Sequence, residues 1–488
     1  MLDRFLSNIP IKVWRMIAMA AFALIVVGAI GMALKMKMWP LYAVPIAAVV
    51  ALQVLYDYKP LFFLLIAAVP ISIQLEIGPL ALDVPSEPLM ILFLVIFLVE
   101  LIAGNQFKQR EKVRPFHLLI FLLLFWTAFT TVTSEFPLRS VKFLLAKLWY
   151  LAAFVWMAQR LILSQEDIKK IFWFFFIPLV IAATIVTVRH ALLGFSFEAS
   201  NNVPIPLFIN AVIYSATLVL FLPWTWFARK WYSAKTLEWY LIHAGMGLLL
   251  LAAFFTYKRG AWLALLLLPF IDQAIKRKFF DKAVYVGVIV LSIALAWLVY
   301  DNRFYVFAPN YQKVIWHEGD LSGHLEATIS GTEISSMERF YRWVAAKNMI
   351  ADMPLAGSGP STFNQVYKRY TDDAFRTYVS DNPEQSTTHN YFLLTFSEQG
   401  FIGGLLFLFL CLFMIVKAAR LYPELSDERK TLLMMVLLSQ MTILFHSLLN
   451  ELIEVDKVGA MFWVNWVIMD KLAKWHEQES GLEESVAK

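Results

Sequence analysis

Cysteine and charged residues are scarce in this chain. The single cysteine, Cys411, lies inside an apolar segment, so neither an internal disulfide bond nor a metal cluster held by several thiolates can form. Only 16% of the 488 residues are charged, whereas soluble globular proteins carry about 25%. This shortage of charge argues against a soluble protein with an unusually apolar core.

Hydrophobic residues make up 60% of the sequence. They occur in blocks of about 17–25 residues, the length with which a helix crosses about 30 Å of hydrocarbon. Because a backbone in lipid must satisfy its own hydrogen bonds, the blocks predict an all-α integral membrane protein with about 12–14 transmembrane helices. The predicted spans are 14–34, 40–56, 59–74, 88–104, 116–134, 141–159, 168–188, 207–228, 238–256, 260–275, 282–300, 391–416, 431–449 and 457–472. The second and third are barely separated, and a re-entrant hairpin is the alternative there.

Basic residues gather in alternate connections, and this pattern predicts the orientation. By the positive-inside rule these connections lie in the cytoplasm, together with both termini. They contain Lys108, Arg110, Lys112 and Arg114; Arg229, Lys230 and Lys235; Lys276, Arg277, Lys278 and Lys282; and Lys417, Arg420, Arg429 and Lys430. The same pattern explains the net charge of +5 without a nucleic-acid partner. Lys35 and Lys37 fall on the opposite side and weigh against this orientation.

One connection is far longer than the others and is predicted to face outward. This long connection divides the chain into four predicted regions. They are transmembrane helices in 1–300, a large loop with short helices in 301–390, further transmembrane helices in 391–472, and a cytoplasmic tail in 473–488. Residues 301–388 hold eight Lys or Arg and eleven Asp or Glu, a formal charge of −3. An anion would therefore bind to a few placed arginines, whose planar guanidinium groups can donate two parallel hydrogen bonds to phosphate.

A helix is predicted inside the loop. Ser335 and Glu338 have the spacing of a capping box, and the segment from Met337 to Met353 contains neither Gly nor Pro. Arg339 and Arg342 are three residues apart and share one face of this helix. A Gly-Ser-Gly-Pro turn follows at 357–360 and predicts a short helix from Ser361.

Two further residues at predicted span boundaries are candidates for chemistry. Arg259 lies at the outer edge of the membrane, where it could bind an anion or simply anchor the helix at the interface. His389 ends the loop, and a histidine there could take a proton from a hydroxyl or could be an ordinary interfacial side chain.

Three motifs occur in order along this part of the chain. They are YKRGAWLAL at 257–265, ERFYRWVAAKNMIADMPLAGSGPSTF at 338–363 and HNYFLLTFSEQGFIGG at 389–404. They contain an Arg-Gly-Ala-Trp element, an Arg ahead of a Trp, a Pro-Leu-x-Gly-x-Gly-Pro turn, a His-Asn pair and a Glu-x-Gly-x-x-Gly stretch. In this order and topology they resemble the bacterial O-antigen ligase/polymerase family.

The resemblance implies a multi-pass protein of the bacterial inner membrane, with a fold similar to that of other lipid-carrier (GT-C-like) glycosyltransferases. Such an enzyme would move a glycan from undecaprenyl diphosphate to a lipid A–core hydroxyl, at a periplasmic active site in contact with membrane lipids. It would need neither a metal nor another cofactor. No Asp-x-Asp motif of metal-dependent glycosyltransferases is apparent in the sequence.

Individual residues carry over from the family's motifs. Arg259 and Arg339 would hold the diphosphate as catalytic residues, and His389 would activate the acceptor hydroxyl. Arg342, Asn390 and Glu398 are expected to bind substrate, although Glu398 could also be a buried structural carboxylate. Three polar residues in the next outer turn are weaker candidates for sugar binding, namely Asn450, Glu451 and Glu454.

Other functions remain open at this point. A polymerase of O-antigen or exopolysaccharide repeat units shares these motifs, and a protein O-oligosaccharyltransferase would use the same donor. A membrane transporter is an alternative from a different class, but no pair of repeated halves is apparent and the large outer loop fits it poorly.

Overall fold

The computed structural model describes residues 57–77, 80–102, 114–308, 334–377, 380–382 and 385–486. The predicted spans 14–34 and 40–56 lie outside these residues. The chain divides into two compact units, Met1–Leu64 and Leu65–Lys488, and the second unit contains every candidate site residue.

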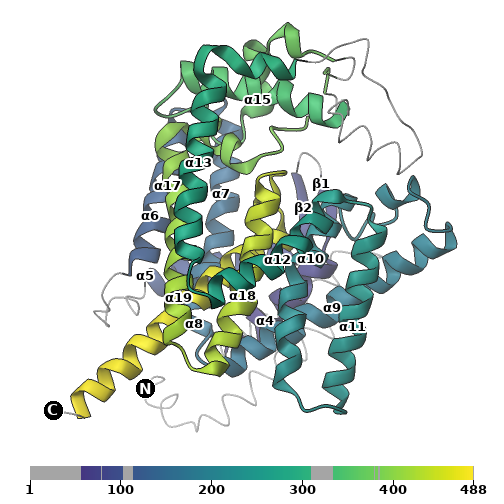
Figure 1. Ribbon diagram of the computed structural model, residues 1–488, viewed down its shortest axis with the longest axis vertical. Coiled ribbons are helices and arrows are strands. Elements are labelled where there is room, and N and C mark those ends of the chain that lie inside the picture. Colours follow the sequence, from purple (N-terminus) through teal and green to yellow (C-terminus); the bar gives the residue numbers. More distant parts are fainter. Residues whose placement is uncertain are drawn as a thin grey trace, which may run out of the picture. The chain divides into compact units, whose positions relative to one another are not determined.

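Helices dominate the described residues (Figure 1). In chain order they are α4 (Lys59–Ala68), α5 (Ser86–Ile102), α6 (Pro115–Val132), α7 (Pro137–Leu151), α8 (Ala158–Leu161), α9 (Gln165–Leu192), α10 (Ala211–Ala228), α11 (Leu237–Phe255), α12 (Arg259–Lys276), α13 (Phe280–Val299), α15 (Ile334–Asp352), α16 (Phe363–Val366), α17 (Tyr391–Leu421), α18 (Asp427–Ser447) and α19 (Asp456–Val486). From 88–104 onward each predicted span coincides with a helix. The structure confirms an all-α integral membrane protein.

Eight helical segments in the described part of the chain are long and apolar enough to cross a membrane. This number is lower than the predicted one for two reasons. The first two predicted spans are not described, and some observed helices are short or carry more charge than a lipid-facing span. For example, α12 includes Arg259, Asp272 and Lys276 among its 18 residues.

The predicted span 59–74 is wrong in its last part. Helix α4 ends at Ala68, and a 3-10 turn over Val69–Ile71 contains Pro70. Two antiparallel strands follow, β1 (Ile73–Ile77) and β2 (Leu80–Val84), with Ile73 opposite Val84. Proline disfavours continuation of the helix, and the sequence IQLEI alternates apolar and polar residues with the period of a strand. Strands β1 and β2 therefore replace the end of the predicted span.

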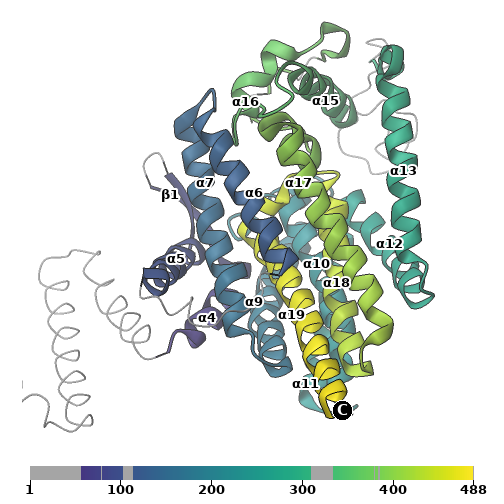
Figure 2. The same cartoon turned by 90° about the vertical axis from the view of Figure 1, so that its left-hand side faces the viewer.

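Helices α10 and α18 form the interior of the second unit. They pack extensively on one another, and 89% of the apolar segment of α10 and 78% of that of α18 are buried. Helix α13 is the opposite case, because none of its apolar segment is buried. Figure 2 shows α13 at the rim of the helices. An apolar helix with so little of its surface buried is stable only if lipid covers the rest, so α13 supports a membrane environment.

The loop folds into a small helical cap beyond one end of α17, here called the loop end (Figures 1 and 2). Helix α15, α16 and the following 3-10 turns share a hydrophobic core that includes Tyr341, Met349, Phe363 and Phe375. Leu393, in the first turn of α17, packs against this core. The cap is therefore continuous with the start of α17.

Helix α15 differs from the prediction at its start. The described residues resume at Ile334, which is already helical, so Ser335 lies inside the helix and is not its N-cap. The predicted end is confirmed, because α15 stops at Asp352, two residues before Pro354. The predicted short helix from Ser361 is also present, starting at Phe363.

Candidate active site

The Pro-Leu-x-Gly-x-Gly-Pro turn and the Glu-x-Gly stretch bind one another through their backbones. Gly359 donates its N–H to the carbonyl of Glu398 at 2.8 Å, and Phe401 donates to the carbonyl of Pro354 at 2.7 Å. These bonds are available because α17 is broken at Gly400, where φ is 67° and ψ is −173°. The break frees backbone groups that a continuous helix would pair internally. The two motifs, far apart in sequence, thus form one interlock.

Close packing explains why glycines occupy this interlock. A Cβ on Gly400 would overlap with the carbonyl of Leu355, and Gly400 also has the positive φ that side chains disfavour. A Cβ on Gly357, where φ is 66°, would lie 2.6 Å from the Glu398 carbonyl oxygen and 2.7 Å from the Gln399 nitrogen. A side chain at either position would push the turn away from α17.

The Glu398 carboxylate is buried and completes the interlock. It accepts hydrogen bonds from the backbone N–H groups of Ser361 at 2.8 Å and Phe363 at 2.9 Å. These groups precede and begin α16, where free N–H groups and the helix dipole favour a negative charge. Glu398 therefore has a structural role, because each of its carboxylate oxygens already accepts a hydrogen bond from the backbone.

Helix α15 holds the segment that leads to His389. Arg342 donates to the carbonyl of Thr387 at 3.1 Å and pairs with Glu338 at 3.4 Å, and Trp343 donates to the carbonyl of Thr388 at 2.8 Å. Glu338 in turn accepts from the hydroxyl of Ser380 at 2.7 Å. Arg342 is buried, so the loop does not present it to solvent as an isolated charge.

His389 is fixed by its neighbours in a left-handed backbone conformation, with φ at 51°. Thr388 donates its hydroxyl to the carbonyl of Asn390 at 2.8 Å. The Asn390 side chain caps α17 by accepting from the N–H of Leu393 at 3.0 Å. A non-glycine residue with positive φ costs on the order of 1–3 kcal/mol and is maintained only by surrounding contacts. Asn390 therefore positions the histidine from the next residue.

The His389 ring meets a polar turn between α18 and α19. Its Nδ1 lies 3.9 Å from Oε2 of Glu451, and it hydrogen-bonds the side chain of Asn450. The hydroxyl of Thr387 donates to the other Glu451 oxygen. The His389 side chain is 30% exposed, which leaves it accessible from outside the protein.

Electrostatics keep His389 neutral. Burial, and then the charges of Arg339 and Arg342, lower the pKa of His389 to about 4, although the hydrogen bond with Asn450 raises it. Burial likewise raises the pKa of Glu451 above its usual range. A neutral imidazole beside two guanidinium groups can accept a proton from a hydroxyl while those groups attract an anion.

Arg259 approaches the same turn from the membrane helices. It is the first residue of α12, and a Cβ placed on the next residue, Gly260, would lie 3.2 Å from Cδ1 of Leu449. Leu449 directly precedes Asn450, so the first turn of α12 packs beside the residues that contact His389. The N-terminus of a helix favours anions, and Arg259 adds a full charge there.

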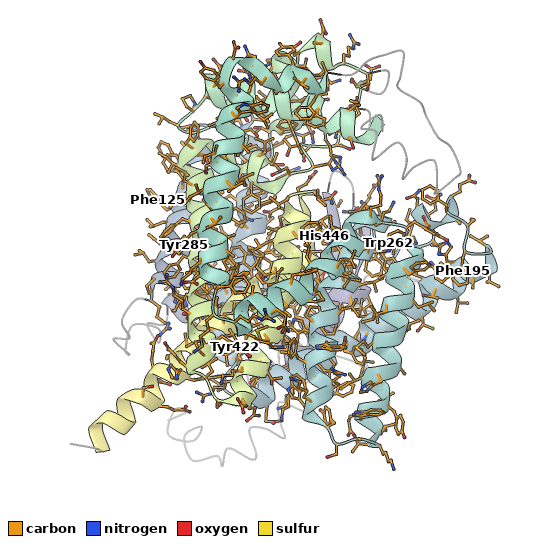
Figure 3. All side chains as sticks on the ribbon, viewed as in Figure 1. Phe125, Phe195, Trp262, Tyr285, Tyr422 and His446 are labelled. Carbon is orange, nitrogen blue, oxygen red and sulfur yellow. The ribbon has the colours of Figure 1, made fainter. Side chains whose placement is uncertain are left out.

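His446 is a further buried side chain at this end of α18. A Cβ on Gly260 would lie 3.9 Å from its Cε1, and among the described residues neither of its ring nitrogens has a hydrogen-bond partner. Figure 3 shows His446 in the interior, at the height of Trp262 of α12. The sequence motifs gave no indication of this residue.

The structure thus brings together His389, Arg339, Arg342, Asn450 and Glu451, and it places Arg259 beside their supporting turn. Glu398 and Asn390 stabilise the arrangement from neighbouring positions. Asn450 and Glu451 were ranked low from the sequence, because a polar turn between two spans is commonly solvated. Among the described residues, no group of three or more His, Cys, Asp or Glu side chains has an arrangement that could hold a metal ion.

A second polar cluster lies next to the site. Lys147 of α7 and the hydroxyl of Tyr391 both donate to Glu454. Lys147 is buried inside an apolar helix, where a charge is costly unless it is paired. This cluster ties α7 and the start of α17 to the turn that carries Glu451.

Comparison with known proteins gives one family match. Residues 244–408 match the family model described as O-antigen ligase. The matched segment includes Arg259, Arg339, Arg342, His389 and Glu398, and it ends before Asn450. The search of curated proteins finds no match.

Proposed function

We propose that this chain, whose residues 244–408 match the family model described as O-antigen ligase, transfers a glycan from undecaprenyl diphosphate to a hydroxyl of a lipid A–core sugar. The observation that carries the proposal is the position of His389. A neutral, partly exposed imidazole lies within the field of two arginines and against Asn450 and Glu451. This combination suits a reaction in which a hydroxyl loses a proton while a diphosphate leaves.

The proposed reaction is a direct displacement. His389 takes the proton from the acceptor hydroxyl, and the acceptor oxygen forms a bond to the anomeric carbon. The bond between that carbon and the diphosphate oxygen breaks, and the diphosphate leaves with the electron pair. Arg339 and Arg259 stabilise its charge through paired N–H donors. No metal is required for this sequence of steps, and we expect transfer to persist after chelation of divalent ions.

Donor binding would also strengthen the base. The charges of Arg339 and Arg342 lower the pKa of His389, and a bound diphosphate would offset those charges. The pKa of His389 would then rise toward its ordinary value, which makes the imidazole a better proton acceptor. In this proposal the base becomes effective when the leaving group is in place.

The three residues expected to bind substrate take supporting roles in the proposal. Arg342 contributes charge and holds Thr387, Asn390 caps α17 and fixes His389, and Glu398 fixes the turn before α16. Glu451 lies beside His389, a contact that was not predicted from the sequence. It would orient the imidazole or bind an acceptor hydroxyl.

We propose that the loop end faces the periplasm and that both termini are cytoplasmic. The distribution of basic residues supports this orientation. Lys417 and Arg420 lie at the end of α17 remote from His389, and Arg429 lies in the first turn of α18, remote from Asn450. Cytoplasmic connections are the ones enriched in Lys and Arg.

The test is a transfer assay in membranes with an undecaprenyl-diphosphate-linked glycan and separate candidate acceptors. Transfer to a lipid A–core acceptor supports the ligase. Transfer to a second carrier-linked unit would instead indicate a polymerase, and transfer to Ser or Thr of a protein would indicate an O-oligosaccharyltransferase. The proposed site would be wrong if His389→Ala and Arg339→Ala both retained full transfer.

A further inference from the structure

An apolar cavity, here called the near cavity, opens below the candidate site. It has a volume of about 240 Å³ and is lined by α12, α17 and α18. These are the helices that begin or end at the candidate residues. Ala264 follows Arg259 by five positions, Phe392 follows His389 by three, and Leu448 precedes Glu451 by three. The near cavity therefore begins about one turn from the proposed diphosphate site and continues into the apolar part of the helices.

A second and larger cavity, the far cavity, lies further along α17. Its volume is about 670 Å³, and it is lined by α13, α17 and α19. Leu412 lines both cavities, so its side chain lies between them. The far cavity ends at charged residues, where Lys417 lies 3.6 Å from Asp470 and Arg420 lies 3.3 Å from Asp281.

The wall formed by α13 leaves the far cavity open to lipid. No part of the apolar segment of α13 is buried, and Ile289, which lines the cavity, is 57% exposed. A lipid chain could enter from the side without passing through the packed interior between α10 and α18. Beyond its break at Gly400, α17 continues from Phe401 to Leu421, about 30 Å at about 1.5 Å per residue. This length matches the roughly 30 Å of hydrocarbon in a bilayer.

We propose that the two cavities hold the isoprenoid chain of the donor and that Leu412 separates short carriers from long ones. The inference rests on the proposed function, because the diphosphate must sit at the mouth of the near cavity. A short chain fills the near cavity alone. A long chain passes Leu412 and enters the far cavity, which provides most of the volume. Apolar burial stabilises in proportion to area, so the enzyme favours long-chain carriers.

The test uses purified full-length protein in detergent micelles, with the same glycan on geranylgeranyl diphosphate or on undecaprenyl diphosphate. For the unmodified protein we expect kcat/KM to be about tenfold or more higher with the undecaprenyl donor. In Leu412→Trp the indole closes the junction of the cavities. The ratio of the kcat/KM values for the undecaprenyl and geranylgeranyl donors should then fall to about one.

Leu405→Trp is the matched control, because Leu405 lies on α17 but is 54% exposed and lines neither cavity. It should keep the preference of the unmodified protein. Equal use of both donors by the unmodified protein would overturn the proposal, as would a preference that persists in Leu412→Trp. If the unmodified protein uses neither donor, the proposed function itself fails.

Photo-crosslinking tests the chain's location without turnover and without a variant. Polyprenyl diphosphates of the two lengths carry a diazirine at the end of the chain, and the labelled peptides are identified by mass spectrometry. The long chain should label the part of α13 that includes Val284 and Ile289, and the short chain should label near-cavity residues such as Ala264. Labelling spread evenly over lipid-facing positions, Leu405 included, would mean that ordinary lipid fills the cavities and would contradict the proposal.

Discussion

Two neighbouring parts of the loop end differ in how fully their polar groups are satisfied. In the interlock of residues 354–361 with 397–401, backbone groups pair across the contact and the Glu398 carboxylate accepts two N–H groups. Around His389, the Nε of Arg342 and the Oε2 of Glu451 are buried with no hydrogen-bond partner in the described part of the chain, and His389 itself has a positive φ. The first part is complete without a ligand, and the second is not.

The difference shows how a strained site can be maintained. Buried polar groups without partners and a left-handed residue each cost free energy, and they persist only when surrounding contacts fix them. Here the interlock and the α17 cap provide those contacts within about three turns of helix. Variants in the interlock should therefore change stability, and variants around His389 should change transfer.

The largest effect is expected from His389→Ala. Loss of the proposed base should lower the rate of glycan transfer by about 10³-fold, because general base catalysis contributes on the order of 10²–10⁴. The thermal midpoint should change little, since the side chain is 30% exposed and the backbone at this residue is held by the bonds of Thr388 and Asn390. His243→Ala is the control, because His243 contacts Trp239 in its own helix, through its ring and through a hydrogen bond with the Trp239 carbonyl. Comparable losses in both variants would argue against a specific role for His389.

The next effect concerns the interlock. Gly400→Ala should destabilise the protein by several kcal/mol, on the order of 3 or more, because the new Cβ meets the Leu355 carbonyl and φ is 67°. The measurement is the thermal midpoint and the yield of monodisperse protein in detergent. In Gly247→Ala a Cβ meets no atom within 4 Å, and stability should be unchanged or slightly higher. Equal stability of both variants would show that the interlock is not rigid.

A smaller change is expected from Glu398→Gln. The amide retains one acceptor, but its NH2 group faces a backbone N–H that loses its partner, at a cost of about 1–3 kcal/mol. The protein that remains folded should transfer glycan at a rate within a few-fold of the unmodified protein. Glu135→Gln is the control, since Glu135 forms an exposed pair with Arg369 that should contribute little. A specific loss of transfer at full stability would instead indicate substrate binding by Glu398.

The smallest effect is a shift of the pH profile. Because His389 must be neutral to accept a proton and its pKa is about 4, kcat/KM should stay level as the pH falls to about 5 and decrease below that. Arg342→Gln removes one of the charges that lower this pKa, so the acid limb should move to higher pH. Arg369→Gln should leave it unchanged. A lower rate without movement of the limb would mean that Arg342 acts only by holding Thr387.

Much of the membrane fold could be predicted because apolar length is a local property. The span predicted at 168–188 is the centre of α9, and the predicted loop helix matches α15 at its C-terminal end. The hairpin of β1 and β2 was missed because an apolar block was extended past Pro70 into residues whose period had already changed. The predicted helix length was correct where an apolar block was uniform. It was wrong where the spacing of apolar residues changed from that of a helix to that of a strand.

The site was predictable only in part, for a different reason. The motifs identified His389 and Arg339, but Glu451 is more than 60 residues further along, and its contact with His389 depends on how α17 and α18 pack. Arg342 was expected to be secondary, and the structure shows that its buried bonds hold the segment before His389. Such long-range contacts leave no periodic signal in the sequence.

The break at Gly400 has a consequence for chimeric proteins. A boundary at residue 390 would separate the loop from a membrane helix, but Pro354 and Gly359 bond to residues inside that helix. A loop grafted from a relative without residues 391–404 would face a foreign α17 and lose the backbone hydrogen bonds of the interlock. The smallest segment that can be exchanged between relatives therefore includes the loop and the first part of α17. A chimera should exchange acceptor specificity only when its junction is placed after Gly404.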